Sequence, residues 1–337
     1  MKGKRLVCPC AQRIEVEEFE LGRVPPDGIL VENDCTGVSV GTEIYNWVHG
    51  GEPGQPKKEF PFQTGYCNCG TVVEAGSRVK KVRVGDRVVG MGRHASHAIL
   101  QESDAPKDVY QQVPPAVGSR EAVFIPMAKI GIHGLRVAQV QLGESVAVVG
   151  LGLVGQLMAT LAELAGALPV IGVDINEFRL SKAQARGVGH CVNPQLEENI
   201  EAIIRGFGHG DGVNVVFEAS GKSVLFRSIL KWVCTGGRVV ALGSPREPVE
   251  MDLFTDLHLR EVALLGAMNP LTPTRDNVYY RWTMAREMEI LMRLLAAGRL
   301  RMAELITHEV DPERCQEVYT SLAAGDGEAL GVEFKWR

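Results

Sequence analysis

The sequence has no long run of uncharged apolar residues. None of its apolar stretches approaches the roughly 20 residues that a membrane-spanning helix needs, and its basic start leads into alternating, strand-like sequence instead of an apolar signal core. Neither sign of charge dominates, because 36 Lys and Arg face 41 Asp and Glu for a net charge of -5. This balance gives no electrostatic reason to expect nucleic acid or an anionic membrane as a partner. We therefore expect a cytoplasmic protein.

The sequence also lacks the C-x-x-C spacing of structural zinc sites. Its eight cysteines include two close pairs, Cys8-Pro9-Cys10 and Cys67-Asn68-Cys69, and each pair has one intervening residue where zinc knuckles usually have two or more. Thiols of a cytoplasmic protein of this size stay reduced. We expect neither disulfides nor a metal site built from these pairs.

The 337 residues, 45% of them hydrophobic, are enough for two domains with separate cores. Residues 1 to about 120 alternate like short strands separated by Gly, Pro and Asp turns. Apolar strands then alternate with helical segments, which is typical of a parallel sheet, and an amphipathic helix and a strand-like tail follow. The expected strands of the sheet are 146–149, 170–174, 213–218, 238–243 and 262–266, and the expected late helix is 283–297 with Gly298 at its end.

The most informative motif follows the strand at 146–149. There the chain reads Gly150-Leu151-Gly152-Leu153-Val154-Gly155, which is G-x-G-x-x-G. In such a motif the first glycine allows a tight turn, the second lets the backbone approach a pyrophosphate, and the third lets the next helix pack closely with its N-terminus toward the anion. The order of strand, glycines, helix and second strand indicates a dinucleotide-binding domain.

The second strand of this unit ends in Asp174, about 20 residues after the last glycine. Its carboxylate can accept hydrogen bonds from both ribose hydroxyls of an adenosine and would repel a 2'-phosphate, so NAD is favoured and NADP is the weaker alternative. Arg179 lies just past the strand, and an arginine there can serve a 2'-phosphate.

The whole chain resembles the medium-chain dehydrogenase/reductase family, the zinc-type alcohol dehydrogenases and their relatives. The resemblance rests on Gly37 to Glu43, Gly65 to Val72, Val84 to Val88, Gly150 to Gly155, Phe217 to Gly221, Gly236 to Gly243 and Leu305 to His308. It implies an α/β protein with a Rossmann doubly wound parallel sheet at residues 123–267. It further implies a GroES-like β-rich catalytic domain at residues 1–122 and 268–337, and an active site between the domains.

The resemblance also implies a set of cofactor-binding residues, a small-molecule substrate and a homodimer or homotetramer, the dimer being formed by edge-to-edge extension of the nucleotide-domain sheet. The strand ends at Gly243-Ser244 and Gly266-Ala267 match those that flank the nicotinamide in relatives. The expected cofactor residues are Gly150, Gly152, Leu153, Val154, Gly155, Asp174, Ile175, Arg179, Ala219, Gly243, Ser244, Gly266 and Ala267.

The sequence departs from the family at the catalytic zinc. Relatives take one ligand from a cysteine ahead of G-[ST]-D, one from a histidine in G-H-E and one from a later carboxylate or cysteine. Here these positions hold Val40, Tyr66 and Ile125, and valine and isoleucine cannot coordinate zinc. We expect no metal, although the alternative that Cys35, Cys67, Cys69 or His94 rebuild a site stays open.

Without zinc, side chains must stabilise the substrate oxygen and exchange its proton. Thr42 stands where the family places the hydroxyl of its proton relay. Tyr66 replaces a metal ligand, and its phenol can donate to a developing alkoxide if a neighbouring cation lowers its pKa. Either residue is equally well explained by packing alone.

Lys129 interrupts an otherwise apolar segment, one helical turn after Ile125, at a position that faces the nicotinamide in relatives. Because lysine is rarely buried unless paired, we expect an ammonium group that lines the cleft, with a pKa lowered by desolvation. His94 and His97 follow the turn that borders the cleft in relatives. On a strand their spacing of three places them on opposite faces, and His94 is our candidate for the cleft side.

These residues predict an oxidoreductase that moves hydride between NAD and a polar secondary alcohol, without zinc, with Lys129, Tyr66, Thr42 and His94 as catalytic candidates. Residues 36–43 and 65–72 also resemble the branch with bacteriochlorophyllide-pathway dehydrogenases, where Gly-Tyr commonly replaces Gly-His, which implies a biosynthetic role. Three alternatives remain: a zinc enzyme with relocated ligands, an enone or quinone reductase, and a non-catalytic NAD-binding protein.

Overall fold

The computed structural model describes residues 2–102, 109–208 and 210–337 and divides the chain into two compact units. Unit 1 consists of Met1–Lys129 and Pro270–Arg337, and unit 2 of Ile130–Asn269. The sequence places the boundaries at 122/123 and 267/268, a few residues earlier in each case. The observed first boundary, between Lys129 and Ile130, lies within one continuous helix, α3 (Ile125–Ala138).

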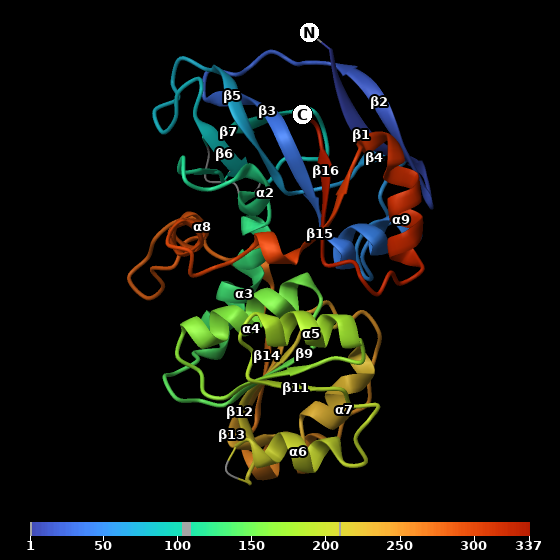
Figure 1. Ribbon diagram of the computed structural model, residues 1–337, viewed down its shortest axis with the longest axis vertical. Coiled ribbons are helices and arrows are strands. Elements are labelled where there is room, and N and C mark those ends of the chain that lie inside the picture. The colour runs from blue at the N-terminus through green and yellow to red at the C-terminus, as the bar shows by residue number, and fades with distance from the viewer. Residues whose placement is uncertain (1, 103–108, 209) are drawn as a thin grey trace. The chain divides into compact units, whose positions relative to one another are not determined.

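Unit 2 is built on a six-stranded sheet in the order β11-β10-β9-β12-β13-β14, with every neighbouring pair parallel. This is the doubly wound arrangement expected from the sequence (Figure 1). The predicted strands are present, and β11 is an addition whose three residues are too few to give a sequence pattern. The strands are β9 (Val146–Val149), β10 (Val170–Val173), β11 (His190–Val192), β12 (Val213–Glu218), β13 (Val233–Ala241) and β14 (Ala263–Gly266).

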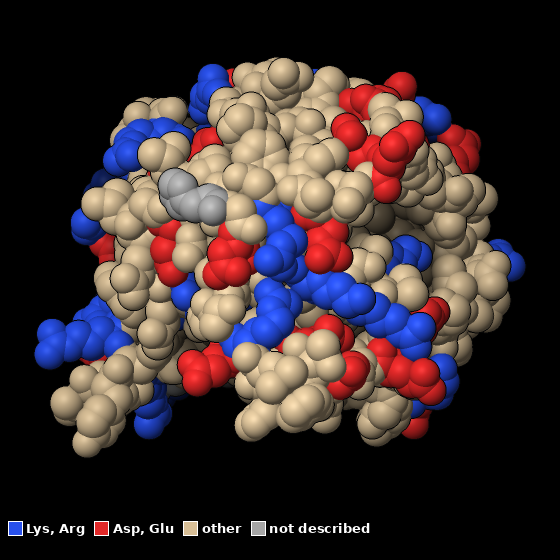
Figure 2. Space-filling view, turned by 90° about the horizontal axis from the view of Figure 1, so that it is seen from below, with Lys and Arg blue, Asp and Glu red and all other residues tan. Residues whose placement is uncertain are grey.

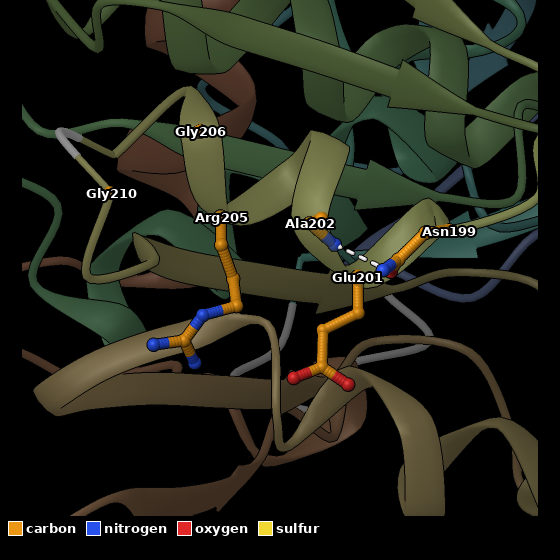
Figure 3. A pocket seen from close by; sticks show the side chains of 6 residues that line it. All are labelled: Asn199, Glu201, Ala202, Arg205, Gly206 and Gly210. Atoms are coloured by element: carbon orange, nitrogen blue, oxygen red, sulfur yellow. Dashed lines mark hydrogen bonds between the residues drawn. The ribbon is translucent and has the colours of Figure 1, made fainter.

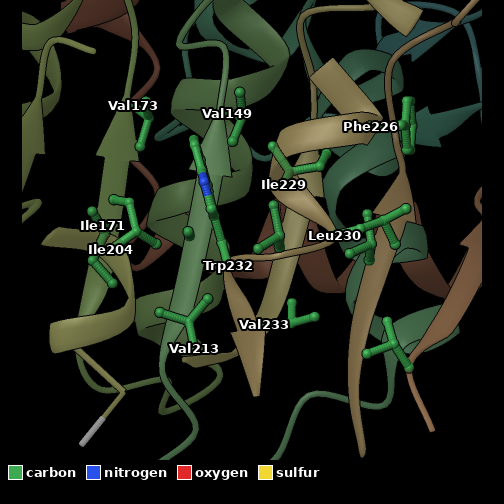
Figure 4. Close-up of a cluster of buried hydrophobic side chains, with 14 of the residues drawn as sticks. Val149, Ile171, Val173, Ile204, Val213, Phe226, Ile229, Leu230, Trp232 and Val233 are labelled. Atoms are coloured by element: carbon green, nitrogen blue, oxygen red, sulfur yellow. The ribbon is translucent and has the colours of Figure 1, made fainter. Parts of the chain in front are cut away.

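Helices cover both faces of this sheet. In Figure 1, α4 and α5 lie on one face and α6 and α7 on the other. Beneath α6 and α7, apolar side chains of the strands and helices form a core with Trp232 at its centre (Figure 4). A 3-10 turn over Ser223–Leu225 directly precedes α7. These helices are α4 (Leu153–Leu164), α5 (Glu177–Ala185), α6 (Ile200–Gly206) and α7 (Phe226–Ile229).

Unit 1 contains two sheets. The larger follows the order β15-β16-β3-β5-β6-β8, with β7 also paired to β3, and the smaller follows β2-β1-β4. The two C-terminal strands thus return to the N-terminal part of the chain, as the sequence predicts. The strands are β1 (Lys2–Cys10), β2 (Arg13–Glu20), β3 (Gly28–Val38), β4 (Phe62–Gln63), β5 (Asn68–Ala75), β6 (Arg87–Gly90), β7 (His97–Gln101), β8 (Gln111–Gln112), β15 (Ile306–Val310) and β16 (Gly331–Lys335).

The helices of unit 1 position the polar residues discussed below. A π-helical turn, η1 (Val40–Ile44), follows β3 and continues into α1 (Tyr45–His49). The late amphipathic helix is α8 (Met284–Ala296), with Thr283 as its N-cap and Gly298 in a left-handed conformation after its end. Two further helices are α2 (Ser119–Ala122) and α9 (Cys315–Ala323), and α9 packs into the same apolar cluster as β1 and β16.

Charged side chains on the surface in Figure 2 include a band of Lys and Arg with acidic side chains along both sides. This surface therefore presents no field of a single sign. No helix within the described residues is both long enough and apolar enough to span a membrane.

Candidate functional site

The ends of four strands in unit 2 form one row. Val149 of β9 pairs with Glu218 of β12, Glu218 with Ala241 of β13, and Ala241 with Gly266 of β14. All four strands are parallel, so the residues that follow them emerge at the same edge of the sheet. The sheet order reverses between β9 and β12, and this switch point is where open α/β sheets bind ligands.

The glycine turn after β9 has the geometry that the motif predicts. Gly150 has a φ of +91°, which favours glycine. A Cβ on Gly155 would lie 1.8 Å from the Gly150 carbonyl oxygen, so only glycine permits this helix to pack so close to the turn. A Cβ on Gly152 would meet no chain atom within 4 Å, which leaves open space beside the backbone at the start of α4. That space suits the approach of a phosphate.

Asp174 is buried at the end of β10, next to this turn. Its Oδ2 accepts a hydrogen bond of 2.6 Å from the Leu151 amide, and its Oδ1 accepts one of 2.9 Å from the Asn176 amide. A carboxylate has about four acceptor sites, so two sites are left for the hydroxyls of a ribose. Arg179 lies on α5, and its guanidinium is 4.0 Å from Asp174 Oδ2. Its positive charge therefore lies beside the carboxylate that is expected to bind the ribose.

The remaining expected cofactor residues lie at the row of strand ends or next to it. Leu153 and Val154 begin α4, and Ile175 is 59% exposed directly after Asp174. The other four, Ala219, Gly243, Ser244 and Ala267, follow β12, β13 and β14. Backbone hydrogen bonds hold three of them: the amide of Ala219 donates to the Val149 carbonyl, that of Gly243 to the Glu218 carbonyl and that of Ala267 to the Ala241 carbonyl. Ser244 is exposed.

Glu218 is a residue of this edge to which sequence reasoning gave no function. It is fully buried at the end of β12, and its carboxylate accepts hydrogen bonds from the amides of Ser220 and Gly221 and from the Ser220 hydroxyl. Burial raises the pKa of this carboxyl, and the hydrogen bonds partly offset the rise. Glu218 thus holds the turn opposite Gly150, whose own Cβ would lie 2.7 Å from the Ser220 nitrogen.

In unit 1 the structure brings Tyr66 and Thr42 together and adds Ser39. The Tyr66 phenol donates a hydrogen bond of 2.5 Å to Ser39 Oγ. Burial raises the pKa of Tyr66, and Cys67 and Glu43 add to the rise, whereas hydrogen bonds with Ser39 and Thr42 lower it in part. The expectation that a neighbouring cation lowers this pKa is wrong, because burial is the largest influence and the pKa is raised. The phenol therefore stays protonated.

Behind this group lies the carboxylate of Glu43, which is 3% exposed. Its Oε1 accepts the Ser39 amide at 2.7 Å. Its Oε2 accepts the Thr64 hydroxyl at 2.8 Å, the Tyr319 phenol at 2.6 Å and His94 Nε2 at 2.9 Å. Burial favours the neutral acid, but the charge and hydrogen bond of His94, and the bonds from Tyr319 and Ser39, outweigh it and lower the pKa of Glu43.

His94 is fully buried, and both of its ring nitrogens have partners. A carboxylate only accepts, so Nε2 must carry the proton that is shared with Glu43, and Nδ1 lies 2.7 Å from Thr36 Oγ1. The backbone differs from the expected strand, because β7 begins only at His97. Gly65 makes the enclosure possible, since a Cβ there would lie 2.7 Å from the His94 nitrogen. The catalytic role of His94 remains a prediction.

Lys129 belongs to a second polar cluster in unit 1. It is fully buried, its Nζ donates to Thr272 Oγ1 at 3.5 Å, and the buried Glu287 of α8 acts on its charge. Burial lowers the pKa of the amine to about 8, and Glu287 opposes that shift. Sequence reasoning missed both partners, because a threonine in a loop and a glutamate in an amphipathic helix are ordinary at such positions.

The positions of the family's zinc ligands do not fit a metal. Val40 lies in η1, and Ile125 is fully buried at the start of α3. Neither side chain has a lone pair, and Tyr66, at the position of the family's histidine ligand, is hydrogen-bonded to Ser39. The thiols of Cys35, Cys67 and Cys69 are buried, and burial raises their pKa, which disfavours the thiolate that zinc requires. Over the described ranges, no group of three His, Cys, Asp or Glu could hold a metal.

A surface hollow in unit 2 lies away from these residues (Figure 3). The side chains of Glu201 and Arg205 extend in the same direction from α6. None of the lining residues is one of the expected cofactor residues, and we do not assign the hollow to the site. It is lined by Asn199, Glu201, Ala202, Arg205, Gly206 and Gly210.

The two glycines of the turn provide a matched pair of variants. We predict that Gly155→Ala lowers the free energy of unfolding by about 1–3 kcal/mol or more, because its methyl group would overlap the Gly150 carbonyl. Gly152→Ala should leave stability nearly unchanged, because its methyl group meets no chain atom. Urea unfolding of both variants measures the difference, and equal losses would contradict this account of the turn.

The Glu43 cluster predicts a pH dependence of stability. Because the folded-state pKa of Glu43 is lowered, its contribution is present above the unfolded pKa of about 4.3 and is lost as the pH falls through the folded value. Glu43→Gln should cost about 3–5 kcal/mol at pH 7, and its difference from wild type should shrink as the pH is lowered below 4. Urea titrations at several pH values measure this.

Tyr319→Phe is the control for that experiment, because it removes one bond to Glu43 and keeps the ring that stacks on Phe334. We expect a loss of about 1.5–3 kcal/mol. A difference between Glu43→Gln and wild type that stays constant from pH 7 to pH 3 would show that Glu43 is not ionised in the folded protein.

Comparison with known proteins finds a matching family model for part of each unit. Residues 25–107 match the alcohol dehydrogenase GroES-like domain, and residues 154–281 match the zinc-binding dehydrogenase family. D-guloside 3-dehydrogenase of Escherichia coli (strain K12) is 30% identical over 259 residues, which are 77% of this chain and 73% of that protein. L-threonine 3-dehydrogenase of Chelativorans sp. (strain BNC1) is 26% identical over 95% of each chain.

The fold is shared with solved structures as well. A structure described as a zinc-binding dehydrogenase from Sinorhizobium meliloti 1021, bound to NADP, superposes with a TM-score of 0.84 at 23% identity over 99% of each chain. These findings confirm the fold expected from the sequence. The chain belongs to the zinc-type medium-chain dehydrogenase/reductase family and is an oxidoreductase that acts on alcohol groups.

Proposed function

We propose that this protein is an NAD-dependent oxidoreductase that interconverts a polar secondary alcohol and its ketone without a catalytic zinc ion, in a biosynthetic pathway. The observation that carries the proposal is the replacement of the three zinc-ligand positions by Val40, Tyr66 and Ile125. In place of a metal, this part of unit 1 holds a protonated phenol fixed between hydroxyls, with a buried carboxylate behind it.

The chain's own residues then handle the substrate oxygen and its proton. A bound nicotinamide supplies or accepts the hydride. As negative charge develops on the substrate oxygen, the Tyr66 O–H and the Thr42 hydroxyl donate hydrogen bonds to it, and Tyr66 provides the proton in the direction of reduction. The raised pKa keeps the proton on the phenol at neutral pH but makes the phenol a weaker acid, so its proton transfer depends on the groups that stabilise the phenolate.

Lys129 contributes positive charge to the same reaction. Its burial means that little water screens its charge, so an ammonium here stabilises an alkoxide more strongly than a surface lysine would. With a pKa of about 8, the amine is protonated at neutral pH and loses its charge just above it. His94, through Glu43, maintains the geometry of the group around Tyr66.

The proposed cofactor is NAD. Asp174 presents its two remaining acceptor sites to ribose hydroxyls and repels a 2'-phosphate, and the exposed Ile175 beside it offers apolar surface to an adenine. Arg179 favours NADP instead, because its guanidinium lies 4.0 Å from the same carboxylate and could attract a 2'-phosphate. A homodimer or homotetramer is also proposed: β14 is the edge strand of the sheet, and Leu264 on it is 37% exposed.

The cofactor proposal predicts the selectivity of two variants. Asp174→Asn keeps the shape of the side chain but removes its charge, so we expect the preference for NADH over NADPH to fall by about tenfold, or 1.4 kcal/mol. Arg179→Ala should change NADH binding little and weaken NADPH. Fluorescence titration with each cofactor measures both, and wild-type protein that binds NADPH more tightly than NADH would overturn the choice of cofactor.

The catalytic proposal predicts the effects of removing the amine and the phenol. Lys129→Met and Tyr66→Phe should each lower kcat/KM for ketone reduction by about 10²–10⁴-fold. In wild type the rate should fall as the pH rises above about 8, because the ammonium that stabilises the alkoxide is lost, and Lys129→Met should abolish this limb. NADH oxidation with a panel of ketones, enones and quinones measures the rates.

Two controls accompany these variants. Lys129→Met removes a positive charge that acts on the buried Glu287, so the double variant Lys129→Met/Glu287→Gln tests whether the loss follows the amine or a disturbed fold. Elemental analysis of active protein tests the absence of zinc. Full turnover in Lys129→Met, or stoichiometric zinc whose removal abolishes turnover, would end the proposed mechanism.

A further inference from the structure

The side chain of Ser39 is used in an unusual way. Ser39 is the N-cap of η1, and a serine at an N-cap commonly accepts a hydrogen bond from an amide of the first turn through its side-chain oxygen. Here the side chain makes no such bond. Its Oγ instead accepts the Tyr66 phenol at 2.5 Å. The side-chain oxygen of Ser39 is therefore hydrogen-bonded to Tyr66 and not to an amide of the turn.

The backbone of Ser39 is held by other means. Its amide donates to Glu43 Oε1 at 2.7 Å, and its carbonyl accepts from the Glu43 amide at 2.8 Å. Glu43 is itself fixed by His94, Thr64 and Tyr319 through its other oxygen. Ser39 is 8% exposed. Its Oγ is therefore held in place, and the main freedom left to the hydroxyl is rotation of its hydrogen about the Cβ–Oγ bond.

We propose that Ser39 is a positioning residue for Tyr66, whose phenol it holds in place and whose oxygen it stabilises by hydrogen bonding while the phenol proton is on the substrate. The proposal rests on the function proposed above. In the resting site Tyr66 donates to Ser39. When the phenol proton passes to the substrate oxygen, that oxygen becomes a hydroxyl and the phenol becomes a phenolate. The Ser39 hydroxyl then rotates and donates to the phenolate, which later recovers a proton from water.

The charges around Tyr66 show why such a donor is needed. Glu43 and Cys67 both disfavour a negative charge on the phenol, as does burial, while Ser39 and Thr42 favour it. Thr42 is expected to face the substrate oxygen. Ser39 therefore supplies a donor to the phenolate in addition to any that Thr42 gives, and a bond between two hydroxyls lets them exchange donor and acceptor without moving either oxygen.

The test uses Ser39→Ala, Ser39→Thr and Tyr66→Phe. Ser39→Ala keeps the backbone bonds to Glu43, so the fold should persist; Ser39→Thr keeps the hydroxyl. Proton NMR should show a far-downfield hydroxyl resonance in wild type and Ser39→Thr. That resonance should be absent from Tyr66→Phe, which assigns it, and from Ser39→Ala. Its persistence in Ser39→Ala would overturn the proposal, because the short bond would then have another acceptor.

Kinetics on the ketone substrate complete the test. We expect Ser39→Ala to lower kcat by about 10-fold or more with little change in KM, because only the charged state of Tyr66 loses a partner, and Ser39→Thr to restore it. An unchanged kcat in Ser39→Ala, with Tyr66→Phe inactive, would overturn the role of Ser39 alone. An unchanged kcat in Tyr66→Phe would instead overturn the proposed function, and the NMR result would still decide whether Ser39 holds the phenol.

Discussion

A buried carboxylate must be satisfied by donors, and in unit 1 that requirement falls on Glu43. Four groups from separate parts of the chain donate to it: the amide of Ser39, the hydroxyl of Thr64, the imidazole of His94 and the phenol of Tyr319. An unpaired charge in the interior costs several kcal/mol. The segments that carry these donors are therefore held together, and the position of Tyr66 follows from the position of Ser39.

Unit 2 depends on a different kind of constraint, which is steric and lies in the backbone. The parallel register aligns Val149, Glu218, Ala241 and Gly266, and the contact between Gly155 and Gly150 leaves no room for a side chain. This turn therefore depends on glycines, whose missing side chains leave room for the neighbouring backbone. The polar group of unit 1, by contrast, is specified by which donors are present.

This contrast explains what the sequence could predict. The strands, the glycine turn and Asp174 are local features, because each depends on the residues of one short segment. The structure contains them where the sequence pattern predicts them. The partners of Glu43 and Lys129 are not local. Tyr319 follows Glu43 by most of the chain, and an aromatic residue at helical spacing in α9 carries no signal that distinguishes a phenol bound to a carboxylate from ordinary core packing.

The pKa of Tyr66 could not be predicted for the same reason. The sequence suggests a cation beside the phenol, but the direction of the shift depends on burial and on Cys67 and Glu43, which only the folded chain brings near it. His94 shows the converse. Its motif indicates a histidine near the site, while the structure shows that it is enclosed, with Thr36 and Glu43 as its partners.

The discontinuity of unit 1 has a consequence for synthesis on the ribosome. Unit 2 is one continuous segment, Ile130–Asn269, whereas unit 1 needs both Met1–Lys129 and Pro270–Arg337. At about 5–20 residues per second, tens of seconds separate the emergence of Glu43 from that of Tyr319. Throughout that interval the nascent N-terminal segment carries a carboxylate whose last donor does not yet exist, so the later-starting half of the protein is the one that can finish folding first.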